Sequence, residues 1–221
     1  MIKLKRKILL GISAAVLGGY MAGLRRALAM GSVQKGVHQL KGDVRINDVP
    51  AREGMDVKAG DMVITGPASS VVFVTNKDAF MVRANSSVEA MGQSGELIVT
   101  GLRIVTGAVL SVFARDERKT IYTPTAIFGI RGTGIYIEAE LSRAYVCLCY
   151  GIVEILSTAD PTVRETLVTQ YHDQPFYVFG KGANKILVRA PFINHKDAEL
   201  TLLEGLTGRR PPFLDRGSDS Y

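Results

Sequence analysis

The stretch that decides the fold is residues 123–134, which read TPTAIFGIRGTG. Its apolar residues and threonines suit a half-buried β-strand, and its glycines suit a strand that bends or approaches a neighbour closely. The glycines do not open a helix, so the stretch lacks the helix N-terminus with which a glycine-rich loop binds phosphate. We therefore expect a bent strand, with Arg131 bracing a carboxylate or backbone carbonyls through its guanidinium group.

Two earlier phrases also join a turn signal to a short strand. They are GDVRIN at residues 42–47 and GDMVITG at residues 60–66. Gly and Asp tolerate the tight backbone of a turn, and we expect the side chains of Asp43 and Asp61 to cap the backbone locally. The Val, Ile and Thr residues that follow favour strands.

Along the rest of the chain, short runs of alternating hydrophobic and polar residues recur, and turn signals separate them. Because no helical segment separates these runs, we predict an all-β fold: a β-sandwich or β-roll of many short antiparallel strands, with one short C-terminal helix. Beyond the strand that contains Val44 and Ile46, the expected strands are 70–75, 79–84, 95–101, 102–105, 109–114, 119–123, 135–139, 145–149, 152–156, 163–168, 176–179 and 185–189.

The one helical pattern covers residues 195–207. Asn194 is the expected N-cap, Asp197 lies three residues beyond it, and Gly208 suits the position after the C-cap. We expect the tail from Arg209 onward to be extended and partly disordered. Residues 158–221 are thus a C-terminal extension that contains strands, the helix and a flexible tail.

Taken together, the three phrases resemble the FecR domain, the extracytoplasmic module of iron–siderophore signalling regulators. Asn85-Ser86-Ser87 lies between the second and third phrases, and the resemblance covers residues 36–157. Its most specific part is Gly-Ile-Arg-Gly-Thr at residues 129–133, which is similar to the Val-Arg-Gly-Thr signature of the family. The matching positions, to which we assign structural roles, are Gly60, Asp61, Pro124, Arg131, Gly132 and Thr133.

The resemblance implies a β domain that relays the state of an outer-membrane receptor to an inner-membrane regulator of a sigma factor. Regulators of this family carry a cytoplasmic domain before the membrane segment, whereas only seven residues precede the apolar run here. We therefore expect a stand-alone periplasmic or secreted adaptor that contacts another envelope protein.

The N-terminus has the order of a secretory signal. Four basic residues precede the uncharged, mostly apolar run 8–24, and Ala27-Leu28-Ala29 offers a cleavage site. Arg25 and Arg26 lie between the run and that site, where uncharged residues are usual, so an uncleaved anchor in the inner membrane is the alternative. We expect a signal peptide at residues 1–29, with membrane contact through residues 8–24 only if it is uncleaved.

The formal charge of +6 belongs to this leader. Residues 1–29 hold six Lys and Arg and no acidic residue, which leaves 21 basic against 21 acidic residues in the remainder. A neutral domain has no positive field for binding phosphate backbones, so we expect no nucleic-acid partner.

Cys147 and Cys149 are the only cysteines, and two residues apart on a strand they project from the same face. A disulfide between them is disfavoured, because the Cα separation approaches the upper limit. They are either buried apolar residues or, with His172 and His195, ligands of a soft metal ion or of haem iron. Redox chemistry or an intermolecular disulfide is a further alternative in an oxidising compartment.

The three histidines have different surroundings in the sequence. His38 lies in an expected lead-in loop and is predicted to be exposed, and His195 lies in the first turn of the expected helix. His172 precedes Asp173, and a loop histidine of this kind is either solvated or oriented by a carboxylate.

No enzyme motif is present in the sequence. It contains no Gly-x-Ser-x-Gly elbow, no P-loop and no His-Glu-x-x-His. We therefore predict a non-enzymatic binding or signalling module, and a metal- or haem-binding protein, possibly redox-active, is the alternative.

Overall fold

The computed structural model describes residues 35–96, 98–115 and 117–215. In these ranges, fourteen strands join into one sheet and one α-helix follows near the C-terminus. The strands are β1 (Gly36–Lys41), β2 (Val44–Ile46), β3 (Val49–Pro50), β4 (Met62–Thr65), β5 (Ser70–Thr75), β6 (Asp78–Val82), β7 (Ser86–Met91), β8 (Gly101–Val112), β9 (Arg118–Tyr122), β10 (Ala126–Ala139), β11 (Arg143–Ser157), β12 (Arg164–Thr169), β13 (Phe176–Phe179) and β14 (Leu187–Arg189). The helix is α2 (Asp197–Leu206), and a 3₁₀ turn, η1 (Pro212–Asp215), follows it.

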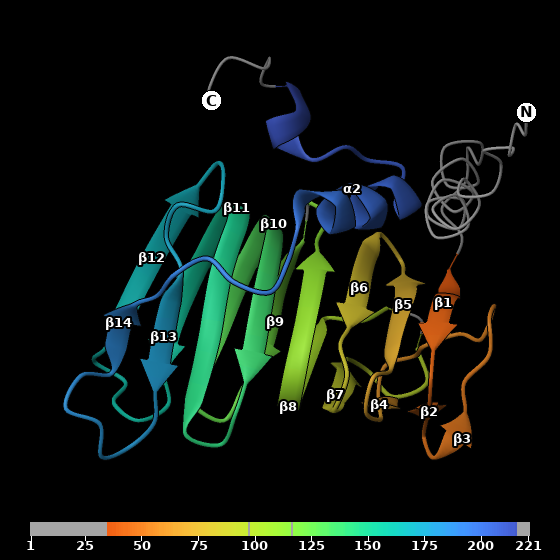
Figure 1. Cartoon of the computed structure of the whole chain (residues 1–221), viewed down its shortest axis with the longest axis horizontal. Helices are drawn as coiled ribbons and strands as arrows, with labels where there is room; N and C mark the ends of the chain where they lie inside the picture. The colour runs from red at the N-terminus through yellow and green to blue at the C-terminus, as the bar shows by residue number, and fades with distance from the viewer. Residues whose placement is uncertain (1–34, 97, 116, 216–221) are drawn as a thin grey trace, which may run out of the picture.

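The sheet folds over into two layers because β8, β10 and β11 each contribute to both (Figure 1). One end of each long strand lies with β1, β5, β6, β13 and β14, which we call the first layer. The other end lies with β2, β3, β4, β7, β9 and β12, which we call the second layer. Described pairings are antiparallel except that of β8 with β9.

Glycines and a bulge mark where the long strands change layer. Gly107 divides β8 and Gly151 divides β11, with φ of 94° and 102° respectively. In β10 the register with β11 shifts between Arg131 and Gly134. Such positive φ angles strain any residue with a Cβ, so glycine permits the bend.

The inner core fills the space between the two layers. It consists of buried aliphatic and phenylalanine side chains from both layers, among them Phe80, Phe128, Ile135 and Leu148, each 0% exposed. Burying each such side chain contributes about 1.5–3 kcal/mol. Sheet-on-sheet packing therefore stabilises this part of the molecule.

A second cluster lies on the outer face of the first layer. Alternate residues of β5, β6, β8, β10 and β11 point there, and α2 lies across β6 and β8 (Figure 1). This outer-face cluster comprises Val72, Val74, Ala79, Met81, Ala108, Leu110, Val112, Tyr136, Tyr145, Cys147, Cys149, Tyr150, Leu200, Leu203 and Phe213.

The predicted fold class is confirmed, with three differences in detail. Strands expected as separate pairs are continuous in β8 and β11, because glycine bends them without ending them. The strand expected at 95–101 does not form: among its described residues only Gly101 is in a strand, as the first residue of β8. His38 lies in β1 and is half-buried, whereas we expected an exposed loop residue.

The helix begins two residues later than expected. Its N-cap is Lys196, because Asn194 has a φ of 61° and lies outside the helix. The carboxylate that accepts the N-cap backbone hydrogen bond belongs to Glu199, at 3.0 Å, and not to Asp197. Gly208 follows the C-cap with a φ of 72°, as expected.

The predicted C-terminal extension continues the same sheet. Strands β12 and β13 both pair with β11. The predicted signal peptide or anchor at residues 1–29 lies outside the described residues, as does the part of the predicted tail beyond residue 215. The part of that tail from Arg209 to residue 215 is not simply extended as predicted, because it forms η1 and Phe213 packs into the outer-face cluster. In the part of the chain that the structure describes, no helix is both long and apolar enough to cross a membrane.

Candidate metal centre

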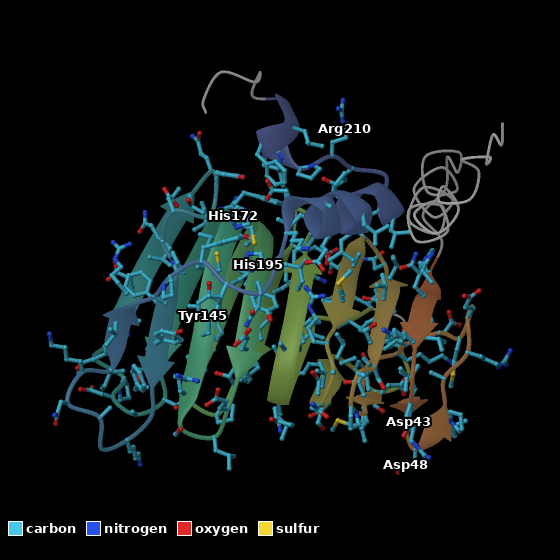
Figure 2. All side chains as sticks on the ribbon, viewed as in Figure 1. Asp43, Asp48, Tyr145, His172, His195 and Arg210 are labelled. Carbon is cyan, nitrogen blue, oxygen red and sulfur yellow. The ribbon has the colours of Figure 1, made fainter. Side chains whose placement is uncertain are left out.

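The structure brings together the four residues singled out as possible metal ligands. Their ligand atoms, from Cys147, Cys149, His172 and His195, all lie within 4.8 Å of one another. Figure 2 shows His172 and His195 side by side on the outer face of the first layer, beneath the chain that leads into α2. The site lies within the outer-face cluster.

Strand β11 positions the two sulfur ligands. Cys147 and Cys149 are separated by one residue, so both point to the outer face, while Leu148 points into the inner core. Both cysteines are free thiols with 0% exposure. This burial opposes the intermolecular disulfide that the sequence left open.

Two loops supply the nitrogen ligands. His172 lies between β12 and β13 with a φ of 41°, and His195 lies just before α2. The side chain of His172 is 7% exposed, and His195 is 4% exposed. All four candidate ligands are therefore shielded from solvent.

The spacing of the ligand atoms fits a tetrahedral ion. With metal–nitrogen bonds of about 2.0–2.1 Å and metal–sulfur bonds of about 2.3 Å, nitrogen ligands lie about 3.3 Å apart and nitrogen–sulfur pairs about 3.6 Å apart. Nε2 of His195 lies 3.2 Å from Nδ1 of His172 and 3.4 Å from Sγ of Cys149. Nδ1 of His172 lies 3.7 Å from Sγ of Cys147.

Each imidazole is held from behind by a hydrogen-bond acceptor. Nε2 of His172 lies 3.0 Å from Oδ1 of Asp197, and Nδ1 of His195 lies 2.7 Å from the carbonyl oxygen of Ile193. Because both partners accept, we assign a hydrogen to each of these ring nitrogens. The other nitrogen of each ring then presents its lone pair to the centre, as in histidine ligands with an outer carboxylate or carbonyl.

This tautomer assignment leaves two lone pairs facing each other. Nδ1 of His172 and Nε2 of His195 are 3.2 Å apart, and two acceptors at that distance repel unless a cation lies between them. A proton on one ring or a metal ion would relieve that repulsion. The convergence of two sulfur atoms on the same point favours a metal ion.

The two thiols differ in acidity. Hydrogen bonding from the Cys149 thiol lowers the pKa of Cys147 to about 4, and His172 and His195 lower it further when a proton occupies the ring nitrogen that faces the sulfur. Burial raises the pKa of Cys149, and the adjacent Cys147 thiolate raises it further. The cysteine pair therefore provides one thiolate and one thiol, and a bound cation would replace the remaining thiol proton.

Tyrosines of the sheet fix the loop that contains His195. The hydroxyl of Tyr145 donates to the carbonyl of Pro191 at 3.0 Å and accepts from the backbone N–H of Ile193 at 3.3 Å. The ring of Tyr136 stacks on His195 with a centroid separation of 4.7 Å. Side chains of the sheet thus fix both the position and the orientation of the His195 imidazole.

The site fits a bare ion better than haem. An iron porphyrin offers protein ligands only its axial positions, on opposite sides of the ring. Four donors within 4.8 Å of one another exceed what those positions accept, and their burial leaves no space for a macrocycle between them. Two thiolates and two imidazoles instead form a closed tetrahedral set typical of structural zinc.

Sequence reasoning missed the residues that orient the ligands. We expected a carboxylate beside His172 to be Asp173, whereas Asp197 holds it, from 25 positions away. Tyr171 also donates to Asp197, at 2.7 Å. No local pattern could have identified these contacts, because the partners meet only when α2 docks on the sheet.

The signature residues of the first two phrases have local structural roles. Gly60 has a φ of 92°, and a Cβ there would lie 2.9 Å from Oγ of Ser94. Asp61 caps its turn as expected, since its Oδ2 accepts from the backbone N–H of Lys58 at 2.7 Å. The carboxylate of Asp43 instead contacts Arg45, at 3.4 Å.

The third phrase lies apart from the metal centre. The carbonyl of Pro124 accepts a hydrogen bond from Thr158, and the hydroxyl of Thr133 lies 2.9 Å from the carbonyl oxygen of Arg131. Gly132 has a φ of 59°, at the bulge of β10. The brace expected of Arg131 is not formed, since its exposed side chain makes no hydrogen bond or ion pair with the described residues. Bulging of β10 turns the arginine outward, away from acceptors.

Comparison with known proteins gives only a distant structural likeness. No protein-family model matches the sequence, and no curated protein matches it. Two crystal structures of a candidate anti-sigma factor from Parabacteroides distasonis, at 2.50 and 1.65 Å resolution, share 13% identity with the chain at a TM-score of 0.47. The match covers 58% of this chain and 58% of that protein. At this distance, the likeness does not assign a function.

Proposed function

We propose that this protein is a non-enzymatic zinc-binding module in which Cys147, Cys149, His172 and His195 form a closed tetrahedral centre. The observation that supports it most is the convergence of four shielded donors within 4.8 Å of one another, with three of the donor pairs at 3.2, 3.4 and 3.7 Å, close to the separations in a tetrahedral zinc site. Protein ligands would fill every position, so the ion would have a structural role and no open site for substrate.

Zinc would fasten the C-terminal segment to the sheet. The sulfur ligands come from β11, whereas the nitrogen ligands come from the loops on either side of β13 and β14. His195 is followed directly by α2, which contributes Asp197 behind His172. A single ion would therefore join the sheet, both loops and the start of the helix.

We place this module outside the cytoplasm, on the basis of the signal-like residues 1–29 and the resemblance to FecR domains. The adaptor role, with an envelope protein as partner, remains a prediction from that resemblance. A buried closed centre is compatible with such a role, because it would stiffen a domain without occupying its surface.

The test is to measure the metal content of tag-free full-length protein by inductively coupled plasma mass spectrometry. We expect one zinc ion per chain, and one bound Co²⁺ after exchange, with the visible bands of tetrahedral cobalt and a thiolate-to-cobalt charge-transfer band. Cys147→Ser combined with Cys149→Ser should abolish both signals. His38→Gln is the matched control for His172→Gln, since His38 is the remaining histidine and lies in β1.

A rescue variant separates ligation from folding. His172→Cys retains four donors as a three-cysteine, one-histidine set and should still bind zinc, whereas His172→Gln should not. Wild-type protein that binds none of Zn²⁺, Co²⁺ and Cu⁺ would refute the proposal. A haem absorption band would instead support the haem alternative.

A further inference from the structure

A groove lined by arginines lies at the edge of the sheet beneath η1, separate from the metal centre. Its first lobe has a volume of about 640 Å³ and is lined by Arg115, Arg131 and Gly132, among other residues. An adjoining lobe of about 550 Å³ is lined by Lys77, Arg209 and Arg210. Both lobes share Arg115, Gly132, Tyr150 and Pro212, so they form one continuous groove.

The described lining residues carry a large excess of positive charge. Five are cationic, and Glu204 is the single carboxylate among them. Glu204 is already bound, because Tyr150 donates to its Oε1 at 2.6 Å and Arg209 pairs with its Oε2. The groove is therefore positive in a domain whose formal charges balance overall.

The groove also contains guanidinium groups that lack acceptors among the described residues. Arg209 is not one of them, because its Nε pairs with Glu204 and its Nη1 donates to the carbonyl of Lys77, and only its buried Nη2 has no partner there. The exposed side chains of Arg115 and Arg131 make no ion pair with the described residues. Arg115 and Arg131 line the same lobe, so a ligand that supplies oxygen atoms to both guanidinium groups would be stabilised here.

Gly132 of the third phrase and Gly151 of β11 shape this groove. A Cβ on Gly132 would lie 2.8 Å from Cγ of Arg115, and a Cβ on Gly151 would lie 2.5 Å from the carbonyl oxygen of Gly132. The absence of side chains thus lets the turn after β8 approach the bulge of β10. That approach places Arg115 and Arg131 at the same lobe.

We propose that this groove binds a phosphoryl group, with Arg115 and Arg131 donating to its oxygen atoms and Arg209 adding positive charge beside them. A guanidinium fork matches phosphate geometry with two parallel hydrogen bonds, and several forks can share one multiply charged anion. Ile152 lines the same lobe and is 40% exposed, so an apolar portion of the ligand would have a contact. The phosphoryl group belongs either to a free phosphorylated compound or to the headgroup of a phospholipid.

Titration calorimetry with pyrophosphate, at an ionic strength of about 0.15 M to screen diffuse attraction, tests the proposal. We expect one pyrophosphate per chain, with binding weakened by about tenfold or more in the Arg115→Gln/Arg131→Gln variant. The matched control, Arg45→Gln/Arg52→Gln, removes equal charge near β2 and β3 and should change the affinity less than about twofold. Zinc content and the thermal midpoint check that the variants are folded.

A second arm of the experiment identifies the source of the phosphoryl group. Flotation with phosphatidylglycerol vesicles, compared with phosphatidylcholine vesicles, reports headgroup binding, and loss of binding in the Arg115→Gln/Arg131→Gln variant assigns it to the groove. Binding of pyrophosphate alone supports a free phosphorylated ligand. Equal binding by both double variants, or no binding of either probe by the wild type, overturns the proposal.

Discussion

The two faces of the first layer are closed in different ways. The inner face packs against the second layer through the aliphatic and phenylalanine side chains of the inner core. Among the described residues, the outer face is covered by α2, its flanking loops and η1, and its cluster contains tyrosines and both cysteines. Where a second sheet covers a face, burial of apolar surface is the main stabilising contribution. Where a ten-residue helix covers it, polar contacts and the proposed ion add directional stabilisation.

The comparison teaches where the function of such a domain can reside. The inner core is built mainly of apolar residues of the right volume, and a buried ion pair between Lys119 of β9 and Asp78 of β6, 3.2 Å apart, lies beside them. The outer-face cluster combines buried sulfur, imidazole and phenol groups. It also depends on α2 and the loop before it, which lie near the C-terminal end of the chain. A ligand that bridges sheet and segment can therefore control the outer face without disturbing the inner one.

The largest effect should follow from a cavity in the inner core. Phe128→Ala should lower the free energy of unfolding by about 3–5 kcal/mol, because Phe128 is 0% exposed. The loss should be the same with and without zinc, as measured by urea unfolding. Leu141→Ala is the control, since Leu141 is 86% exposed and should change the stability by less than about 0.5 kcal/mol. Equal losses in both variants would contradict the proposed division between core and surface.

Zinc should have the next largest effect, and it should be confined to the outer face. A free zinc concentration of about 100 times Kd should raise the free energy of unfolding by about 2.7 kcal/mol. Hydrogen exchange should slow in α2, in the loop before it and in the first half of β11, but not in β2 or β4. If zinc slowed hydrogen exchange evenly over both layers, it would not act locally on the outer face. The same conclusion would follow if the Cys147→Ser/Cys149→Ser variant gained as much protection from exchange as the wild type.

A smaller loss is expected when α2 is deprived of one polar contact with the sheet. Tyr150→Phe should cost about 1–3 kcal/mol, because the buried carboxylate of Glu204 loses a donor at 2.6 Å. Thermal and urea unfolding measure the loss. Tyr122→Phe is the matched control, since the hydroxyl of Tyr122 makes no hydrogen bond with the described residues. A loss as large in the control would mean that the aromatic hydroxyls contribute without regard to their contacts.

The smallest effect should come from an ion pair at the surface. Arg103 lies 3.6 Å from Glu89, with side chains 54% and 32% exposed. Arg103→Gln should lower the free energy of unfolding by about 0–1 kcal/mol, and added salt should remove the difference. Urea unfolding at two ionic strengths measures it. A loss as large as that of Tyr150→Phe would show that surface charges matter more here than buried polar contacts.

Much of the fold followed from local pattern. The run at residues 70–75 coincides with β5, and that at 176–179 coincides with β13, because apolar alternation and turn residues act over short distances. Layer changes within β8 and β11 were not predicted, since a glycine in a strand indicates equally a turn or a bend. The start of α2 was placed two residues early for a similar reason: Asn194 is a favourable N-cap residue but adopts a left-handed conformation here.

The candidate ligands were identifiable by type, but their convergence was not. Spacing along β11 placed Cys147 and Cys149 on one face, since the side chains of a strand alternate. Nothing local could bring His172 and His195 to that face, because both lie in loops whose path depends on β12, β13 and α2. Arg131 was recognised as distinctive, yet its predicted brace failed because the bulge of β10 turns the side chain toward the groove.

Composition and local pattern are sufficient to predict an all-β chain with one helix near the C-terminus, a body of balanced formal charge behind a basic N-terminal stretch, and two cysteines on one strand face. These properties depend on composition and on residues that are close together in the sequence. Only the tertiary structure decided that the sheet folds into two layers, that Asp197 supports His172, and that Gly132 helps to shape an arginine-lined groove. Each of these depends on contacts between residues far apart in the chain, and such contacts are fixed only when the layers and α2 pack together.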